Sequence, residues 1–287
     1  MAVARVLSAR MRDLGGGMMV RRLLPSLGQQ GVGPFVFFDH FGPIEVTPES
    51  NFDVRPHPHI GLATVTYLFE GAMVHRDSLG RTQRIEPGAI NWMTAGRGIV
   101  HSERRPEHLS TRVYSSHGLQ LWTALPTDYE EVEPAFIHTP AHDIPLLEQE
   151  STSVRVLIGS AFGLNSPVAT FAETLYLDVN ARRGSILALE PAYTERAVYG
   201  VDKDIIIDDL VVEPGKMAVL VPGAARITAP EGARYVVIGG APVDGHRHIW
   251  WNFVSSRRER NEQAKGDWAA QRMGVIPGET EWIPLPD

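Results

Sequence analysis

Two segments, RPHPHIG at residues 55–61 and AGRGIVHSE at residues 95–103, each carry two metal-binding side chains spaced two residues apart. In an extended strand, residues i and i+2 project from the same face, so His57 projects with His59, and His101 with Glu103. If the two strands lie side by side in a barrel, the four side chains converge on one interior point. Three imidazoles and a carboxylate suit a divalent first-row transition metal better than calcium or magnesium.

A single His-x-His pair on a strand is more often a surface pair or a hydrogen-bonded pair than a metal site, and this sequence contains 11 histidines. The second pair alters that balance. It follows a Pro87-Gly88 turn and the glycines Gly96 and Gly98, which allow the backbone to bend sharply into a barrel mouth. The sequence therefore favours a metal centre. A further His-x-His, at residues 246–248, has no second pair and is expected to anchor the C-terminal segment.

The same segments resemble a known family. His-x-His, a strand-forming run at residues 64–71, a Pro-Gly turn and a downstream histidine together resemble the cupin barrel motifs. The segments FDHFGP at 38–43, RPHPH at 55–59 and TAGRGIVHSE at 94–103 are similar to those of the pirin family. The likeness covers roughly the first half of the chain directly, and the second half agrees in layout.

This resemblance implies an all-β double cupin, two β-barrel domains with a C-terminal helix, and one iron-type centre in the N-terminal barrel. It implies metal ligation by His57, His59, His101 and Glu103. Cupins usually place a glutamate a few residues after His-x-His, but positions 63 and 64 are Ala and Thr, and Glu103 supplies the carboxylate. One divalent metal is expected, Fe²⁺ by the resemblance, and Ni, Cu, Co, Mn or Zn would suit the same ligands.

The composition excludes several classes of site and partner. The sequence has no cysteine, which rules out disulfides, thiolate metal sites and cysteine nucleophiles. A net charge of -7 argues against sequence-independent binding to nucleic acid, which needs a basic surface. The N-terminal residues form no long apolar run, so we expect neither a signal peptide nor a membrane segment, and a cytoplasmic location.

The chain is expected to divide into an N-terminal barrel at residues 1–137, a C-terminal barrel at 152–245 and an extension at 246–287. Pro214-Gly215 follows Pro87-Gly88 at a distance of 127 residues, which indicates two barrels of one design. The second barrel contains no histidine between Ser151 and Gly245, so no equivalent metal ligands are expected there.

In the extension, Ser256-Arg257-Arg258-Glu259 has the form of a capping box, in which the serine hydroxyl and the glutamate each satisfy a free amide at a helix start. This pattern predicts a helix that ends near Met273, with Gly274 as its stop. We expect the helix to pack on a barrel.

Four further residues are candidates for roles around the metal. His40 lies in an aromatic run, where a polar side chain needs partners, and is expected to form buried hydrogen bonds or to support the ligands. Arg97 and Gln120 are candidates for contacts with the ligands or the substrate, although Arg97 could equally hold its loop. His75 is interpreted as structural or facing the substrate.

The sequence shows no serine-centred triad motif, no phosphate loop and no dinucleotide fingerprint, so the metal is the chemical centre that it indicates. The resemblance implies a dioxygenase that cleaves quercetin or a related flavonol or enolic aromatic with O₂, with Glu103 as catalytic base. The alternative is a metal-binding, redox-sensitive regulatory protein that modulates a transcription factor or metabolic enzyme through a protein partner. An open aromatic-lined cavity favours the enzyme, and a sealed metal beside charged residues favours the regulator.

Overall fold

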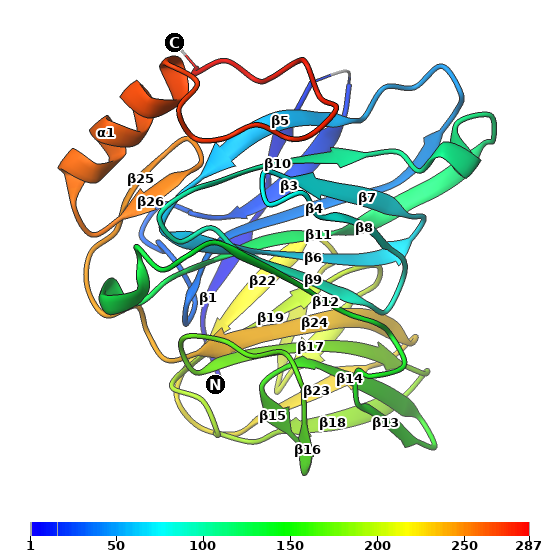
Figure 1. Cartoon of the computed structure of the whole chain (residues 1–287). Helices are drawn as coiled ribbons and strands as arrows, with labels where there is room; N and C mark the ends of the chain where they lie inside the picture. The colour runs from blue at the N-terminus through cyan, green and yellow to red at the C-terminus, as the bar shows by residue number, and fades with distance from the viewer. Residues whose placement is uncertain (1, 16, 287) are drawn as a thin grey trace. The chain divides into compact units, whose positions relative to one another are not determined.

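The computed structural model describes residues 2–15 and 17–286, and strands dominate it (Figure 1). The chain forms two compact units that alternate along the sequence. Unit 1 comprises Met1–Met11, Arg21–Phe38 and His142–Pro242, and unit 2 comprises Arg12–Val20, Asp39–Ala141 and Val243–Asp287. The predicted all-β architecture is confirmed. The boundaries at 137, 152 and 245 stay a prediction.

Unit 2 contains most of a seven-stranded sheet, in the order β12-β9-β6-β11-β4-β3-β2, and a four-stranded sheet, in the order β5-β10-β7-β8; residues 10–11, 21–24 and 35–38 of the first sheet are counted in unit 1. The strands of the first sheet are β12 (Ala135–Thr139), β9 (Ile90–Thr94), β6 (Leu62–Glu70), β11 (Tyr114–Ala124), β4 (Phe35–Val46), β3 (Met19–Leu24) and β2 (Arg10–Asp13). The strands of the second are β5 (Val54–His59), β10 (Ile99–Arg104), β7 (Met73–Asp77) and β8 (Thr82–Ile85). Short 3₁₀ helices lie at Glu107–Leu109 and Thr127–Tyr129.

Unit 1 repeats this plan with a seven-stranded sheet ordered β1-β22-β19-β24-β17-β14-β13 and a four-stranded sheet ordered β18-β23-β20-β21. The first contains β1 (Val3–Ser8), β22 (Lys216–Leu220), β19 (Glu195–Gly200), β24 (Ala233–Gly240), β17 (Thr174–Ala181), β14 (Thr152–Ile158) and β13 (Leu146–Gln149). The second contains β18 (Ser185–Leu189), β23 (Ala225–Ala229), β20 (Ile205–Ile207) and β21 (Leu210–Val212), and a small hairpin joins β15 (Ser160–Ala161) to β16 (Leu164–Asn165).

The two barrels therefore share one design, as the 127-residue repeat predicted. Gly88 and Gly215 both have a positive φ, of 86° and 78°, in the turns before β9 and β22, which occupy the same place in their sheets. In unit 1, β18 and β23 correspond to the ligand strands β5 and β10. They contribute Leu187, Leu189 and Ile227 to a hydrophobic core, whereas β5 and β10 of unit 2 carry histidines.

The C-terminal extension belongs to unit 2 and ends the chain with β25 (His248–Trp250), β26 (Phe253–Ser255) and α1 (Arg258–Ala269), the one α-helix in the described part of the chain. Apolar side chains from this extension pack against Ile60 and Val100, which belong to the ligand segments. The cluster consists of Ile60, Val100, Phe253, Ala264, Trp268 and Ile276. The expectation that the helix packs on a barrel is thus confirmed.

The predicted capping box is wrong. The N-cap residue of α1 is Arg257, it makes no side-chain capping bond, and the helix ends at Ala269 rather than Met273. The hydroxyl of Ser256 instead donates to Oε2 of the buried Glu130 at 2.9 Å, and its amide donates to Oε1 at 2.7 Å. A tertiary partner has taken the hydroxyl that the local pattern assigned to the helix end.

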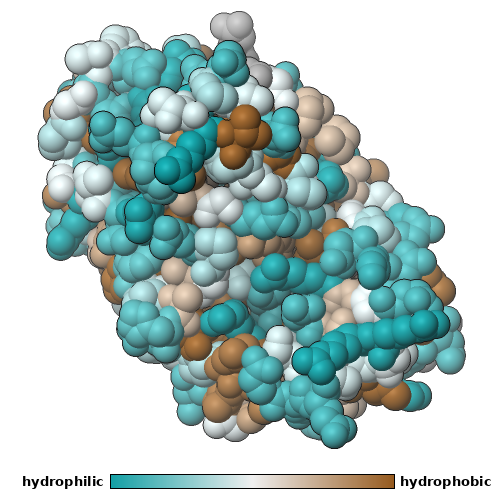
Figure 2. Space-filling model, turned by 90° about the vertical axis from the view of Figure 1, so that its right-hand side faces the viewer, coloured by the Kyte–Doolittle hydropathy of each residue, from teal (hydrophilic) through white to brown (hydrophobic). Residues whose placement is uncertain are grey.

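Hydrophilic side chains predominate on the face shown in Figure 2, where hydrophobic residues occur in small separate groups. Among the described residues, no helix combines the length and the apolar character that crossing a membrane requires.

Candidate metal centre

The metal-ligand candidates lie on two neighbouring antiparallel strands, β5 and β10, in which His101 is directly opposite His57. β5 is the outer strand of its sheet, which explains how it tolerates Pro56 and Pro58 between its histidines, since proline cannot donate a ladder hydrogen bond. His57 and His59 share a face, as their i, i+2 spacing predicted.

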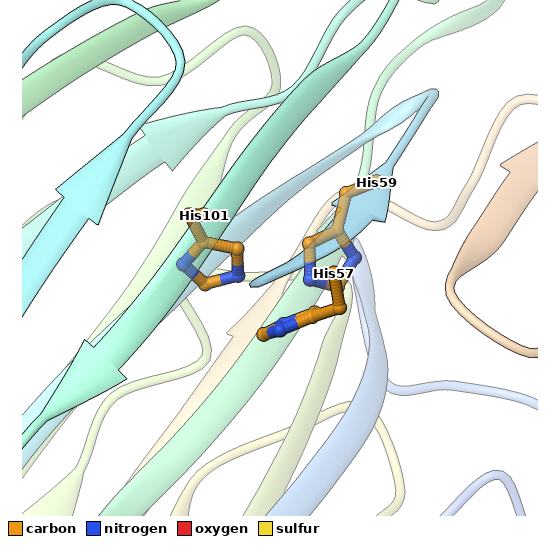
Figure 3. A group of neighbouring side chains, drawn as sticks. All are labelled: His57, His59 and His101. Carbon is orange, nitrogen blue, oxygen red and sulfur yellow. The ribbon is translucent and has the colours of Figure 1, made fainter. Parts of the chain in front are cut away.

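The three imidazoles form one compact buried group (Figure 3). One ring nitrogen from each of His57, His59 and His101 lies within 4.8 Å of the others. The side chains are buried, with exposed fractions of 7%, 1% and 2%. The ring centroids of His57 and His101 are 4.3 Å apart, and that of His59 lies 5.0 Å from each.

The hydrogen bonds of two rings leave their Nε2 atoms available as ligands. Nδ1 of His57 donates to the carbonyl of Arg55 at 2.9 Å, and Nδ1 of His59 donates to the carbonyl of Asn252 at 3.2 Å. Such bonds fix the tautomer and direct the lone pair of the other nitrogen towards a metal. Both ring nitrogens of His101 are buried without a hydrogen-bond partner among the described residues. Because an unsatisfied buried polar group is costly, this arrangement fits a metal ion.

Burial also keeps the rings in their ligating form. Desolvation lowers the pKa of His57 to about 4, against a hydrogen bond to Arg55 that raises it. Desolvation holds the pKa of His59 and of His101 well below the ordinary value, and repulsion from neighbouring imidazoles lowers both pKa values further. All three rings are therefore neutral at pH 7, and a metal need not displace a proton from them.

Glu103 lies beside the three histidines and outside their compact group. Its Oε1 is 3.7 Å from Nδ1 of His101, and its side chain is 11% exposed. A β-bulge between His101 and Glu103 places Glu103 opposite Val54. Burial raises the pKa of Glu103 to about 7, although the adjacent Arg104 lowers it. Its role as a fourth ligand stays a prediction.

A cavity of about 30 Å³ lies against Glu103, within unit 2. Its lining combines charged residues such as Asp53, Arg104 and Arg105 with apolar ones such as Met18 and Val46. A space of this size holds a water molecule or two rather than a small-molecule substrate.

His75 forms a buried pair with Asp77, which the sequence analysis did not single out. Nε2 of His75 lies 2.9 Å from Oδ2 of Asp77, and both side chains are buried. On β7, His75 is opposite Glu103 and Asp77 is opposite His101. The His75 ring stacks on Phe136 and lies 5.3 Å from the His101 ring, centroid to centroid. The i, i+2 spacing of His75 and Asp77 in the sequence could have indicated this pair.

The remaining candidates lie in three different settings. His40 is buried, with its Nε2 2.7 Å from Nε2 of His117. Oε1 of Gln120 accepts a hydrogen bond from the Thr66 hydroxyl at 2.9 Å. The Arg97 side chain is 61% exposed and pairs with Glu133 at 2.8 Å, which favours a role in holding its loop. Functions for these residues at the site stay predictions.

The segment at 246–248 anchors the extension through its central residue. Arg247 is buried, pairs with Glu130 at 2.8 Å and donates to the carbonyl of Leu125 at 2.9 Å. The rings of His246 and His248 lie 4.7 Å apart, centroid to centroid.

Comparison with known proteins gives the family. The Pirin family model matches residues 17–123, and the model of the Pirin C-terminal cupin domain matches residues 176–274. A pirin-like protein of Caulobacter vibrioides is 44% identical over 98% of this chain and 99% of its own length.

Two solved structures agree in fold. The crystal structure of quercetin 2,3-dioxygenase from Acinetobacter baumannii is 32% identical, with a TM-score of 0.91 over 99% of this chain and 95% of that one. The bacterial pirin YhhW from Escherichia coli, crystallised in complex with nickel(II), is 16% identical, with a TM-score of 0.66 over 83% and 99% of the two chains. The two family models and the Caulobacter relative show that the chain belongs to the pirin family, with N- and C-terminal cupin domains.

Proposed function

We propose that this protein is a metal-dependent dioxygenase that cleaves quercetin or a related flavonol or enolic aromatic with O₂. The observation that carries the proposal is the buried, neutral group of His57, His59 and His101 with a carboxylate beside it. The likeness at 32% identity to a protein named quercetin 2,3-dioxygenase supports the choice of substrate.

Nε2 of His57, Nε2 of His59 and a ring nitrogen of His101 would hold the ion, with Glu103 as the proposed fourth ligand. We propose Fe²⁺ as the metal. A bound divalent metal supplies a Lewis-acid centre that stabilises negative charge on a substrate hydroxyl oxygen. The burial of the three histidines keeps competing water from the centre, as an oxidative site requires.

Glu103 is the proposed base for the 3-hydroxyl proton of the flavonol. In the metal-free protein burial raises the pKa of Glu103, which makes its carboxylate a stronger base than an ordinary glutamate. His75 and Asp77 lie on the neighbouring strand β7 and close that side of the site. One flavonol and one O₂ give one depside and one carbon monoxide.

Oxygen uptake with quercetin tests the proposal, on protein whose metal has been quantified and then replaced with iron. We expect uptake that requires the metal, forms depside and carbon monoxide, and is abolished in Glu103→Ala. His246→Ala is the matched control, because its ring is exposed and contacts His248 rather than the histidine group. No uptake at full metal occupancy would contradict the proposal.

One observation favours a second candidate, a metal-binding regulatory protein. The cavity at Glu103 measures about 30 Å³, far below the roughly 300 Å³ of small-molecule pockets, and Asp53, Arg104 and Arg105 are among the residues that line it. A flavonol can enter there only if the cavity widens. If the protein is regulatory, a protein partner should bind the metal-loaded protein and should not bind the His101→Ala variant. The metal-loaded protein should then take up no oxygen.

A further inference from the structure

The segment that follows α1 buries one carboxylate within an otherwise exposed stretch. Pro277, Gly278, Thr280 and Glu281 are exposed, whereas the Glu279 side chain is 5% exposed. A buried carboxylate is unfavourable unless ion pairs and hydrogen bonds replace the lost water. The partners of Glu279 should therefore indicate what this segment does.

The carboxylate of Glu279 binds two side chains of the ligand strand β10. Its Oε1 accepts from the Ser102 hydroxyl at 2.7 Å and from Nε of Arg104 at 3.2 Å, and its Oε2 pairs with Nη2 of Arg104. These hydrogen bonds outweigh desolvation and lower the pKa of Glu279, so the side chain is ionised at neutral pH. Arginine held by both carboxylate oxygens has a fixed orientation.

Ser102 and Arg104 alternate with His101 and Glu103 along the strand. Since successive side chains in a strand point to opposite faces, Glu279 holds one face of β10 while the metal-ligand candidates project from the other. A shift of Ser102 or Arg104 therefore moves His101 and Glu103 with it.

The pairing of the two ligand strands is irregular at this position. In the ladder between β10 and β5, His101 pairs with His57 and Glu103 with Val54, so two residues of β5, Arg55 and Pro56, lie opposite the single residue Ser102 of β10. A bulge weakens the ladder and re-aims the side chains beside it. The hydroxyl of Ser102, the residue opposite this bulge, is the one that Glu279 binds.

The same segment also contacts the other ligand strand, and in Figure 1 the red C-terminal trace runs next to β5. The amide of Ile283 donates to the carbonyl of Pro56 at 2.8 Å, next to His57. The carbonyl of Ile283 in turn accepts from Nε1 of Trp268 in α1 at 2.9 Å. All of these residues belong to unit 2.

We propose that Glu279 is a positioning residue of the metal centre, which holds β10 opposite the bulge of β5 through Ser102 and Arg104 and so sets the positions of His101 and Glu103. The proposal rests on the metal centre proposed above and not on the oxygenase activity. It predicts an effect on metal binding even if quercetin is not a substrate.

The experiment compares Glu279→Ala, Glu279→Gln and Glu281→Ala as full-length proteins loaded with Ni²⁺ or Co²⁺. The rate of metal transfer to an excess of chelator is measured, together with the visible spectrum of the Co²⁺ form. Residues that support metal ligands typically contribute about 10–100-fold in affinity, so we expect Glu279→Ala to release metal about 10–100-fold faster. Its cobalt spectrum should change as well.

Glu279→Gln should be intermediate, because its amide oxygen can still accept from Ser102 while the ion pair with Arg104 is lost. Glu281→Ala is the matched control. Glu281 also binds Arg104, at 2.8 Å, but its side chain is 52% exposed. We expect its release rate to stay within about twofold of the original protein, as for most exposed ion pairs.

A merely structural role gives a different result: the thermal midpoint of the metal-free protein falls, while release rate and cobalt spectrum stay unchanged. That outcome in Glu279→Ala overturns the proposal. If Glu279→Ala does not fold, an unchanged rate and spectrum in Glu279→Gln overturn it equally. If the original protein binds neither metal, the assignment of the metal centre is wrong. This result differs from a failure of the role proposed for Glu279, in which the original protein binds metal and the variants release it at the same rate.

Discussion

The backbone carbonyl of Asn252 accepts a hydrogen bond from Nδ1 of His59 at 3.2 Å, across 193 residues of sequence. His57 takes its orientation from Arg55, two residues away, whereas its neighbour His59 takes it from the turn between β25 and β26. The C-terminal extension therefore helps to orient the histidine group.

Removing one imidazole should remove most of the metal affinity. His57→Ala and His101→Ala each leave two histidines of a group whose donor atoms lie within 4.8 Å. We expect each variant to lose at least about 100-fold in affinity, more than the loss of a supporting residue costs. Metal content after equilibration with a buffered metal solution measures this. His246→Ala should keep its full content, and equal losses in all three variants would contradict the assignment.

Metal uptake should release a proton from Glu103 if this residue is a ligand. With a pKa of about 7, Glu103 is about half protonated at pH 7, while the three imidazoles are already neutral. We expect release of about half a proton per metal at pH 7 and close to none at pH 9. Titration of metal into weakly buffered protein with a pH indicator measures the release.

Glu103→Gln is the control for that titration, since its amide fills the same space and carries no titrating proton. Its proton release at pH 7 should be near zero. The same release from Glu103→Gln as from the original protein would remove Glu103 from the ligand set.

Several features of the site follow from local sequence. The i, i+2 spacing of His57 and His59 determines a shared face in any strand, and the turn glycines Gly88 and Gly215 mark equivalent places in the two barrels. Such patterns depend on residues close together in the chain, and for this reason the all-β double cupin could be predicted.

Other features depend on contacts that no local pattern encodes. The supports of the site, Asn252 and Glu279, come from the C-terminal extension. The Ser256 hydroxyl binds Glu130 instead of capping a helix, since a buried carboxylate 126 residues away competes for it. The bulge that places Glu103 opposite Val54 depends on the pairing of β10 with β5. Each of these required the tertiary structure.

The metal-free protein should lose stability on acidification through its ligand histidines. The pKa of His57 is about 4 in the folded state and 6.5 when unfolded. Between these values the unfolded state binds more protons, so the free energy of unfolding rises with pH and falls as pH drops from 6.5 to 4. Above pH 6.5 both states are neutral at this residue and the effect is absent.

His57→Gln isolates this contribution, because the other titrating groups are common to both proteins. The free energy of unfolding of the original protein minus that of His57→Gln should fall by up to about 3 kcal/mol between pH 7 and pH 4. Urea unfolding of both metal-free proteins at several pH values measures it. A difference that does not vary with pH would show that burial does not hold His57 neutral.

Replacing Gly61 tests the link between the ligand strand β5 and the C-terminal extension. Gly61 has a φ of +66°, and a Cβ there would lie 1.9 Å from the carbonyl oxygen of Val254, two residues after Asn252. Gly80 has a similar φ of +79°, and a Cβ there would meet nothing within 4 Å, so Gly80→Ala carries the backbone strain without the collision. We expect the free energy of unfolding of Gly61→Ala to be roughly 2 kcal/mol or more below that of Gly80→Ala, because a backbone oxygen must move. It should also bind metal more weakly, since the displaced Val254 shifts the carbonyl that orients His59. Urea unfolding and metal competition measure the two effects, and equal values for the two variants would show that the extension does not constrain the ligand strand.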